Sequence, residues 1–580
     1  MVVYKSVQQR RHTAQSLARW RDRLQRYAAG DLACHARVVT LLMDFGELEA
    51  GIADALCPER DSDCQPVRAC RQMSLVLGRL LVLSWTRQTE AIRPWLASLH
   101  RTLAALMRLP LPETVQISVP EGYAYYGLYP ETYFAAATRC WHELRPQRAV
   151  CIGIRSIGTS LSAVVAATLA ACGVPIHAFT VRPRGHPFDR CLHLTVRLAA
   201  LWRALREAYF LIVDEGPGLS GSSFACVAQK LAELGVSDER IVFLPSWEPE
   251  ASQLLSTTAQ QRWRRHRKYT ADFAAVWLHS GRLRPAWPQS VCHDLSGGRW
   301  RALVYQSDAE YPAVQPQHER RKYLYQKRGG RAAVLLKFAG LGRYGTAKLR
   351  RAAALAAAGF APRVFGLRHG FLITEFVAGR PLTPGDVEPS LLHTMARYLA
   401  YLQQHCPAPA GASSAALLDM IRVNVTEGLG ADWAQRLQGL EPLQAAGGAM
   451  ASSAVDGRML PHEWLRTAHG FIKTDGVDHH ADHFFPGCQD IAWDLAGSCA
   501  EFRLDRAQRA LLVQQYQALS RDTTVTKRLP FFLIAYLAYR LGYTTLAATA
   551  LGPSPDGARF TRLTQRYAAL LRRAICAHLM

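Results

Sequence analysis

Several signals that would narrow the function of this 580-residue chain are missing from it. Its fourteen cysteines include no Cys-x-x-Cys pair, and no spacing in the chain is typical of a zinc finger. The first residues, MVVYKSVQQRRH, are too polar for a secretory leader. We therefore expect reduced, mostly buried thiols and a cytoplasmic protein.

Long hydrophobic runs are missing as well. The best candidate for a membrane segment, residues 529–539 (LPFFLIAYLAY), has eleven residues between two arginines. A membrane-spanning helix needs about 20 apolar residues, so this segment is predicted to be a core helix and no membrane association is expected. The length of 580 residues predicts about three or four folded domains, and half of the residues are hydrophobic, which is enough for full cores. No segment of the chain is repetitive.

Acidic residues are scarce relative to basic ones. The chain has 46 Asp and Glu against 69 Lys and Arg, a formal net charge of +23. This excess favours phosphate-bearing partners, nucleic acid among them. However, the charge is dispersed, its densest run (262–268) is short, and no nucleic-acid-binding motif is visible. Small-molecule substrates therefore remain the expected partners, and the oligomeric state is not indicated.

The most informative segment is residues 210–224, FLIVDEGPGLSGSSF. Its four apolar residues predict a strand buried in a parallel sheet, and the segment after it predicts a helix. The glycines and serines between them suit a phosphate, because backbone N–H groups, hydroxyls and a helix N-terminus would converge there. Asp214 and Glu215 cannot bind phosphate themselves, but they suit sugar hydroxyls or a divalent metal.

This segment resembles the ribose-phosphate signature of type I phosphoribosyltransferases. The resemblance implies that Asp214 and Glu215 hold ribose hydroxyls and that Ser220–Ser223 bind the 5′-phosphate, although the spacer is one residue longer than usual. Residues 149–173 are similar to the diphosphate loop of the family, and the basic stretch 176–190 is similar to its mobile lid. The ribosyl diphosphate site implied in this way comprises Arg155, Ser156, Gly158, Thr159, Arg182, Arg184, Asp214, Glu215, Ser220, Gly221, Ser222 and Ser223.

A second pattern lies in the C-terminal half. Residues 292–305 (CHDLSGGRWRALVY) predict a strand, a glycine turn and a second strand, and residues 332–340 predict a strand whose one charged residue is Lys337. An alanine-rich helix and two more strands follow, the last ending at Glu375. This order resembles the small lobe of aminoglycoside and choline phosphotransferases, a protein-kinase-like group. The resemblance implies an ATP site with Gly297, Gly298, Lys337 and Glu375.

The remainder of a kinase-like site is present in altered form in residues 454–497. Asp475 follows a short strand, so the resemblance assigns it to magnesium, and Glu463 stands near the metal-binding asparagine of the group. Asp456 is the nearest upstream carboxylate that could serve as catalytic base, and Asp494 resembles a structural aspartate at a helix start. The His-Gly-Asp loop of the group is absent, and the helix after Lys337 has no acid to pair with it, although Glu319 lies upstream.

Acids and histidines are dense between residues 475 and 483. They include Asp475, Asp478, His479, His480, Asp482 and His483. A zinc or manganese site is one interpretation, but the spaced pairs of a structural zinc site are missing. We favour a loop of an active site in which one acid binds magnesium and the histidines are hydrogen-bonded.

Together these patterns predict a mixed α/β and α+β multidomain protein. We expect a helical domain (1–108), a Rossmann-like parallel-sheet phosphoribosyltransferase domain (109–258), a basic linker (259–284) and a two-lobed kinase-like domain (285–580). The favoured function is a two-headed transferase that uses phosphoribosyl diphosphate, ATP and Mg²⁺. The alternatives are a nucleotide sensor with degenerate sites and a basic nucleic-acid-associated factor.

Overall fold

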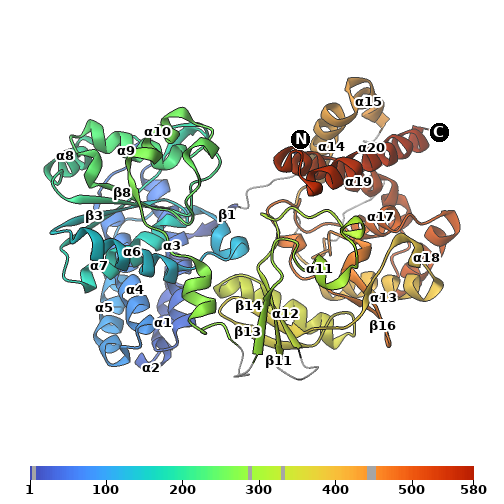
Figure 1. Ribbon diagram of the computed structural model, residues 1–580, viewed down its shortest axis with the longest axis horizontal. Helices are drawn as coiled ribbons and strands as arrows, with labels where there is room; N and C mark the ends of the chain where they lie inside the picture. The colour runs from blue at the N-terminus through green and yellow to red at the C-terminus, as the bar shows by residue number, and fades with distance from the viewer. Residues whose placement is uncertain (3–7, 285–289, 328–332, 410, 440–451, 580) are drawn as a thin grey trace. The chain divides into compact units, whose positions relative to one another are not determined.

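The computed structural model describes residues 1–2, 8–284, 290–327, 333–409, 411–439 and 452–579 (Figure 1). The chain divides into two compact units. The first unit comprises residues 7–286 and 340–344, and the second comprises residues 1–6, 287–339 and 345–580. The predicted boundary between residues 284 and 285 adjoins a segment that lies outside the described residues.

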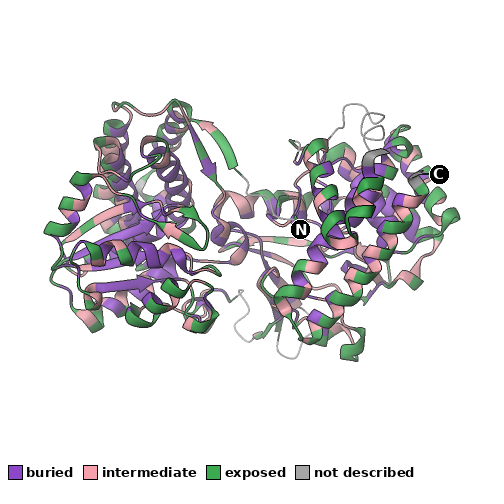
Figure 2. Ribbon diagram, turned by 90° about the horizontal axis from the view of Figure 1, so that it is seen from above, coloured by how far each residue is buried: buried purple, intermediate pink, exposed green. Residues whose placement is uncertain are grey.

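A five-stranded parallel sheet is the centre of the first unit. The strand order is β4-β3-β7-β8-β9, with β3 paired in register to β4 on one side and to β7 on the other. The strands are β3 (Ala149–Ile154), β4 (Ile176–Val181), β7 (Tyr209–Val213), β8 (Ile241–Leu244) and β9 (Arg267–Lys268). The three central strands are buried on both faces, as their continuous apolar runs predict (Figure 2).

Helices cover the sheet on both faces. Trp202, Phe224 and Trp263 pack against Ile152, Phe210 and their neighbours from one side. These three aromatic residues belong to α8 (Val196–Ala204), α9 (Ser222–Glu233) and α10 (Thr257–Arg265). On the other side lies α7 (Gly158–Ala171), which also contacts α6 (Pro130–Leu144). The sheet is therefore the middle layer of an α/β/α arrangement.

The N-terminal region is helical, as expected. Its helices are α1 (Thr13–Gln25), α2 (Ala29–Leu32), α3 (His35–Leu56), α4 (Gln65–Trp85) and α5 (Ile92–Leu106). Both α3 and α4 pack on α7, and Gly78 lies so close to it that an added Cβ atom would be 2.4 Å from the carbonyl oxygen of Ala163. The strand β1 (Gln8–His12) pairs with β2 (Thr114–Ser118). The boundary at residue 108 stays a prediction, and the structure places the residues on both sides of it in one unit.

Two segments of the first unit differ from expectation. The expected basic lid begins with β4, which pairs with β3, and continues as a hairpin of β5 (Arg184–His186) and β6 (Asp189–Cys191). The expected linker after residue 258 forms most of α10 together with β9, which extends the sheet beside β8. Trp263 and Tyr269 of the expected linker are buried, so this stretch is a packed element despite its many arginines, whereas the hairpin of β5 and β6 is mostly exposed.

The second unit combines a five-stranded antiparallel sheet with a larger helical part. The sheet has the order β10-β11-β12-β14-β13. Its strands are β10 (Ser290–Asp294), β11 (Lys322–Lys327), β12 (Ala333–Phe338), β13 (Val364–Arg368) and β14 (Phe371–Glu375). The helix α12 (Gly342–Ala357) follows β12. The expected order of strand lysine, helix and two strands is thus confirmed.

One expected strand is a helix. After β10 the chain turns at Gly297 and Gly298, which both have positive φ, and then forms α11 (Arg301–Val304). The Arg301 side chain donates to the carbonyl oxygen of Gly298 and makes two bonds to Asp556. This anchor holds residues 301–304 in a helical turn, so the prediction of a strand there was wrong.

The helical part of the second unit surrounds a small sheet and an irregular loop. Its helices are α13 (Pro389–His405), α14 (Ser414–Leu429), α15 (Ala431–Gln435), α17 (Ala492–Glu501), α18 (Arg506–Ser520), α19 (Val525–Leu551) and α20 (Pro555–Leu579). The small sheet consists of β15 (Arg380–Pro381), β16 (Trp464–Thr467) and β17 (Gly470–Lys473). By length and composition α19 could cross a membrane, but 78% of its most apolar stretch is buried in the protein, as expected for a core helix. It lies side by side with α20 (Figure 1).

Candidate functional site

Two cavities in the second unit meet at one group of charged residues. The first cavity, of about 450 Å³, is lined by Leu335 and Leu372 of the antiparallel sheet and by the segment 375–379. The second cavity, of about 580 Å³, is lined by α19, α20 and the stretch between α11 and β11. The residues that line both are Trp300, Glu319, Lys322, Lys337, His462, Glu463 and Asp475.

Lys337 is the central cation of this group. It lies on β12, and its Nζ is 2.5 Å from Oδ1 of Asp475 and 3.3 Å from Oδ1 of Asp478. Burial alone would lower the pKa of Lys337, but the two carboxylates outweigh it and raise the pKa. The structure therefore brings together two residues that the sequence predicted, Lys337 and Asp475, and adds Asp478.

Further cations neutralise the same acids. Arg320 contacts Asp478 at 3.4 Å and Asp482 at 2.9 Å. Lys348 of α12 is also buried nearby, and burial lowers its pKa to about 8 despite the attraction of Asp478. The helix after β12 thus presents a lysine and not an acid. Alternating buried charges of this kind hold each other in place, because an unpaired one is costly.

The glycine turn is tied to Glu319. The N–H of Gly298 and the indole N–H of Trp300 both donate to its carboxylate, at 2.9 Å, and Lys322 lies 3.3 Å away. Glu319 is consequently engaged with the turn and with Lys322, while Lys337 takes its partners from the segment after β17.

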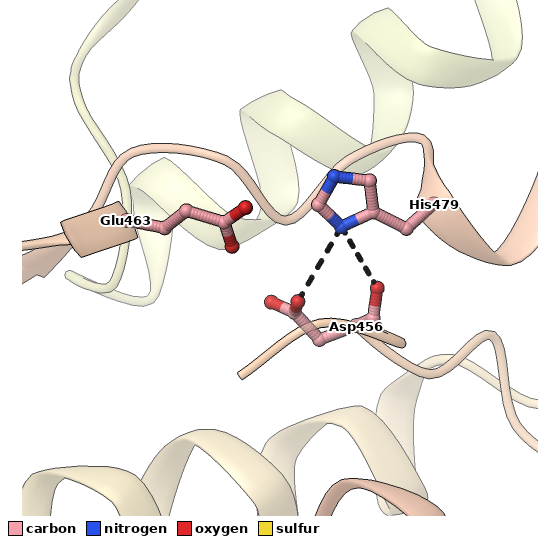
Figure 3. Close-up of side chains that lie close together, drawn as sticks. All are labelled: Asp456, Glu463 and His479. Atoms are coloured by element: carbon pink, nitrogen blue, oxygen red, sulfur yellow. Dashed lines mark hydrogen bonds and ion pairs between the residues drawn. The ribbon is translucent and has the colours of Figure 1, made fainter. Parts of the chain in front are cut away.

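A buried loop surrounds Asp456. The hydroxyl of Tyr398 donates to its carboxylate at 2.6 Å, and Nζ of Lys473 lies 3.3 Å away. His479 faces it, with Nδ1 3.2 Å from the Asp456 carbonyl oxygen and 3.7 Å from Oδ1 (Figure 3). Asp456 is fully buried and lines neither cavity. Its carboxylate is covered by Tyr398, Lys473 and His479.

Asp494 fixes the backbone of the same loop. It lies in the first turn of α17, and its carboxylate accepts the N–H groups of Asp456 at 2.6 Å and of Gly457 at 2.8 Å. Burial, and then the nearby charge of Asp456, raise the pKa of Asp494 to about 7. A carboxylate at a helix start that holds a loop backbone is the structural role that the sequence resemblance implies for Asp494.

Two groups of acids and histidine are close enough to share a metal ion. One is Asp475, Asp478 and His479, and the other is Asp456, Glu463 and His479; in each, the ligand atoms lie within 4.8 Å of one another. The first fits magnesium better, because Asp475 lines both cavities and its Oδ2 accepts no hydrogen bond from the residues that the structure describes. Glu463, the other predicted metal ligand, is 2.7 Å from Nζ of Lys473 and does not share a group with Asp475.

The sequence interpretation missed Arg458. The group that this region resembles has an asparagine about five residues after its aspartate, and Glu463 follows Arg458, not Asp456, by that distance. Arg458 lines the second cavity. The five-residue distance from Arg458 to Glu463 is visible in the sequence. Arg458 was not considered for the aspartate position because the expected residue there is an acid.

The predicted loops of the first unit flank the point where the strand order reverses. The loop at residues 155–158 follows β3, and the loop at residues 214–221 follows β7, its neighbour in the sheet. The carboxyl ends of such neighbouring strands form the usual ligand crevice of an open parallel sheet. Helix α9 begins at Ser222, directly after the second loop, and Gly221 has the positive φ that this turn requires.

The arginines predicted for a diphosphate are paired with acids of the first unit. Arg155 is almost fully buried, contacts Asp54 at 3.1 Å and also contacts Asp61. Arg182 binds Asp54, and Arg184 lies 3.3 Å from Asp61. Burial lowers the pKa of Arg155 to about 10. These contacts hold the predicted lid on the last turn of α3 and on the segment that follows it.

The predicted ribose acids lack such partners. Asp214 and Glu215 form no ion pair within the described parts of the chain, although the N–H of Gly122 donates to Glu215 at 3.2 Å. Burial raises the pKa of Asp214 to about 7; burial and the charge of Asp214 raise that of Glu215 to about 8. Of the serines, Ser222 donates to the carbonyl oxygen of Pro187, and its hydroxyl lies 3.1 Å from that of Ser220.

Comparisons with known proteins give matches in structure only. No protein-family model and no curated protein matches the chain. Three similar solved structures are a choline/ethanolamine kinase family protein from Mesorhizobium loti, a choline kinase from Streptococcus pneumoniae and an aminoglycoside phosphotransferase from Alicyclobacillus acidocaldarius.

Each of these three matches covers less than half of this chain. The first has 16% identity and a TM-score of 0.34 over 44% of this chain and 89% of the other. The second has 15% identity and a TM-score of 0.32, over 43% of this chain and 89% of the other. The third has 13% identity and a TM-score of 0.30, over 44% of this chain and 90% of the other. These values are too low to transfer a fold or an activity, so the function is argued below from the residues of the site.

The two unpaired acids of the first unit should make stability depend on pH. Their pKa values in the folded state, about 7 and about 8, lie above the ordinary values, so the folded state holds protons that the unfolded state releases. This stabilisation is complete below about pH 4 and is lost as the pH rises to 8. Asp214→Asn combined with Glu215→Gln should raise the free energy of unfolding at pH 8 by about 2 kcal/mol or more.

Thermal unfolding of the full chain at pH 5 and pH 8 tests this expectation. The melting temperature of the parent should fall more between the two values than that of the double variant. Glu239→Gln, at an exposed acid of the same unit, is the matched control and should behave like the parent. Parallel pH curves for parent and double variant would contradict the assignment.

Proposed function

We propose that the second unit is a kinase-like phosphotransferase that binds a nucleoside triphosphate in the first cavity and a small-molecule acceptor in the second. One observation carries the proposal: Lys337 and Asp475 form an ion pair at the place where both cavities meet. Phosphoryl transfer depends on positioning and on neutralising the phosphate charge, and a lysine with a metal-binding acid supplies both.

The roles follow from the geometry. The apolar walls of the first cavity, such as Leu335, suit a nucleobase, and Lys337 then lies at the end where phosphates would be. Magnesium, when bound, would neutralise the phosphate charge, and Asp475 with Asp478 would hold it. The Lys337 ammonium would exchange part of its contact with Asp475 for phosphate oxygens. The acceptor oxygen would form the new bond to phosphorus as the bond to the nucleoside diphosphate breaks.

Loss of either member of the ion pair should remove nucleotide binding. Lys337→Ala deletes the cation that would contact the phosphates, and Asp475→Ala deletes the acid assigned to magnesium. Isothermal titration with magnesium and ATP should show at least a tenfold weaker affinity for each, corresponding to about 1.4 kcal/mol or more. Lys327→Ala, at an exposed lysine of the same sheet, is the control and should bind as the parent does. Binding by Asp475→Ala that equals the parent would contradict the metal assignment.

A nucleotide sensor is the second candidate, and the burial of Asp456 favours it. A catalytic base must reach the proton of the acceptor, and Asp456 lines neither cavity. Its hydrogen bond from Tyr398 and its contact with Lys473 suit a structural carboxylate. A sensor would bind magnesium and ATP without transferring phosphate to any acceptor.

Asp456→Asn separates the two roles of this residue. If Asp456 is structural, the variant should lose about 1–3 kcal/mol of stability, because a buried contact with Lys473 is weakened, while its affinity for magnesium and ATP stays within twofold of the parent. Chemical denaturation and titration measure the two quantities. Unchanged stability together with abolished phosphate transfer would instead identify Asp456 as the base.

A ribosyl diphosphate site remains a proposal for the first unit. The position of the two loops at the strand-order reversal favours it, since this is where open parallel sheets bind phosphorylated ligands. The pairing of Arg155, Arg182 and Arg184 with Asp54 and Asp61 implies that these contacts would open before the arginines could receive a diphosphate. Phosphoribosyl diphosphate affinity that is unchanged by Asp214→Asn with Glu215→Gln would argue against it.

A further inference from the structure

We propose that the second cavity binds an anionic small molecule, one that carries a phosphate or carboxylate group beside a ring. The proposal concerns the ligand of the second cavity alone. Its role as phosphate acceptor rests on the proposed function, whereas its binding does not.

The charge of the lining points to an anion. Nine Lys or Arg residues line the second cavity against seven Asp or Glu residues. Most of these cations are paired: Arg320 contacts two aspartates, and Arg540 and Arg566 both contact Glu501. Three of the nine cations form no ion pair, and their guanidinium groups form no hydrogen bond, with any residue that the structure describes. They are Arg458, Arg503 and Arg562. The cavity consequently presents uncompensated positive charge.

Arg458 is the key member of this set. Its Nε is buried and has no hydrogen-bond partner among the described residues, and its guanidinium lies 5.2 Å from the ring centre of Tyr543. Arginine does not lose its proton in proteins, so the group stays charged. The carboxylate of Asp482 attracts it, but no acid in the part of the chain that the structure describes forms an ion pair with it. Such a group is costly unless an anion meets it, and a carboxylate or phosphate fits the guanidinium in two parallel hydrogen bonds.

Aromatic side chains in the lining indicate the shape and polarity of the rest of the ligand. Trp300, Tyr305, Tyr311 and Phe560 line the cavity along with Tyr543. Aromatic walls accept a planar or apolar body, and arginines at the edge then bind its charged end. The volume of about 580 Å³ is that of a site for a small organic molecule and is too small for a macromolecule.

The position of the cavity connects this ligand to the nucleotide. The second cavity shares Lys337, Asp475 and His462 with the first. Burial lowers the pKa of His462 to about 3, so this imidazole stays neutral and adds no positive charge. A ligand whose anionic end lies at Arg458 would place its other end towards the shared residues, where the phosphate of a nucleotide would lie.

Titration calorimetry with small charged probes tests the inference. The full chain is titrated with phenyl phosphate, benzoate and choline, with and without a saturating non-hydrolysable ATP analogue and magnesium. At least one of the two anions should bind, choline should not, and raising the ionic strength should weaken the binding. The comparison of the two anions distinguishes a phosphate ligand from a carboxylate ligand.

Three variants locate the binding. Arg458→Gln should weaken the affinity for the bound anion at least tenfold, and Arg458→Lys should restore part of it, while the affinity for ATP is unchanged. Arg562→Gln, at an exposed position that folding should tolerate, should weaken anion binding about two- to fivefold. Arg506→Gln lies on α18 outside both cavities and is the matched control.

The outcomes separate this inference from the proposed function. Anion binding that depends on Arg458 supports the inference even if ATP does not bind, which would then contradict the proposed function alone. The inference is overturned if neither anion binds, if choline binds as well as the anions do, or if a folded Arg458→Gln or Arg562→Gln variant binds the anion as the parent does.

Discussion

The site of the second unit depends on one buried ammonium group. Lys337 lies on an apolar strand, where an unpaired charge would cost several kcal/mol, so carboxylates must be brought to it. Asp475 and Asp478 supply them from the segment after β17, and Arg320 in turn neutralises Asp478. The sheet and the segment after β17 are therefore held together by charge as well as by apolar packing, and both cavities are built around this pair.

The need to pair a buried ammonium group with carboxylates also determines the conformation of the neighbouring loop around Asp456. Lys473 is buried with Asp456 and Glu463, so this second ammonium has carboxylates on two sides. Asp494 then orders the loop backbone through two N–H groups. The carboxylate of Asp456 compensates Lys473 in the interior, and Asp456 lines neither cavity. A loop ordered in this way is suited to position a ligand, and whether Asp456 acts as a base stays a prediction.

Local patterns in the sequence were enough to identify many of the elements and some of the charges. A single lysine on an apolar strand predicted Lys337, and a strand followed by an acid predicted Asp475. The partners of these groups were not predictable, since Asp478 follows Lys337 by 141 residues and Asp54 precedes Arg182 by 128, and local periodicity carries no information on such pairs. The helical turn at α11 was missed for the same reason: Asp556, which anchors it, lies 255 residues further along the chain.

The two units differ in the sign of the buried charges that have no ion-pair partner. In the first, Asp54 and Asp61 neutralise the arginines, while Asp214 and Glu215 form no ion pair with any residue that the structure describes. In the second, lysines and Arg320 neutralise the acids, while the guanidinium of Arg458 is attracted by Asp482 but forms no ion pair within the described ranges. A ligand gains the most binding free energy at a charged group that has no ion-pair partner in the protein. The free energy cost of burying that group is already present in the folded state, and binding of the ligand removes it. The first crevice therefore favours a ligand with hydroxyl donors or a cation, and the second cavity favours an anion, whereas the net charge of the chain alone predicts only phosphate-bearing partners.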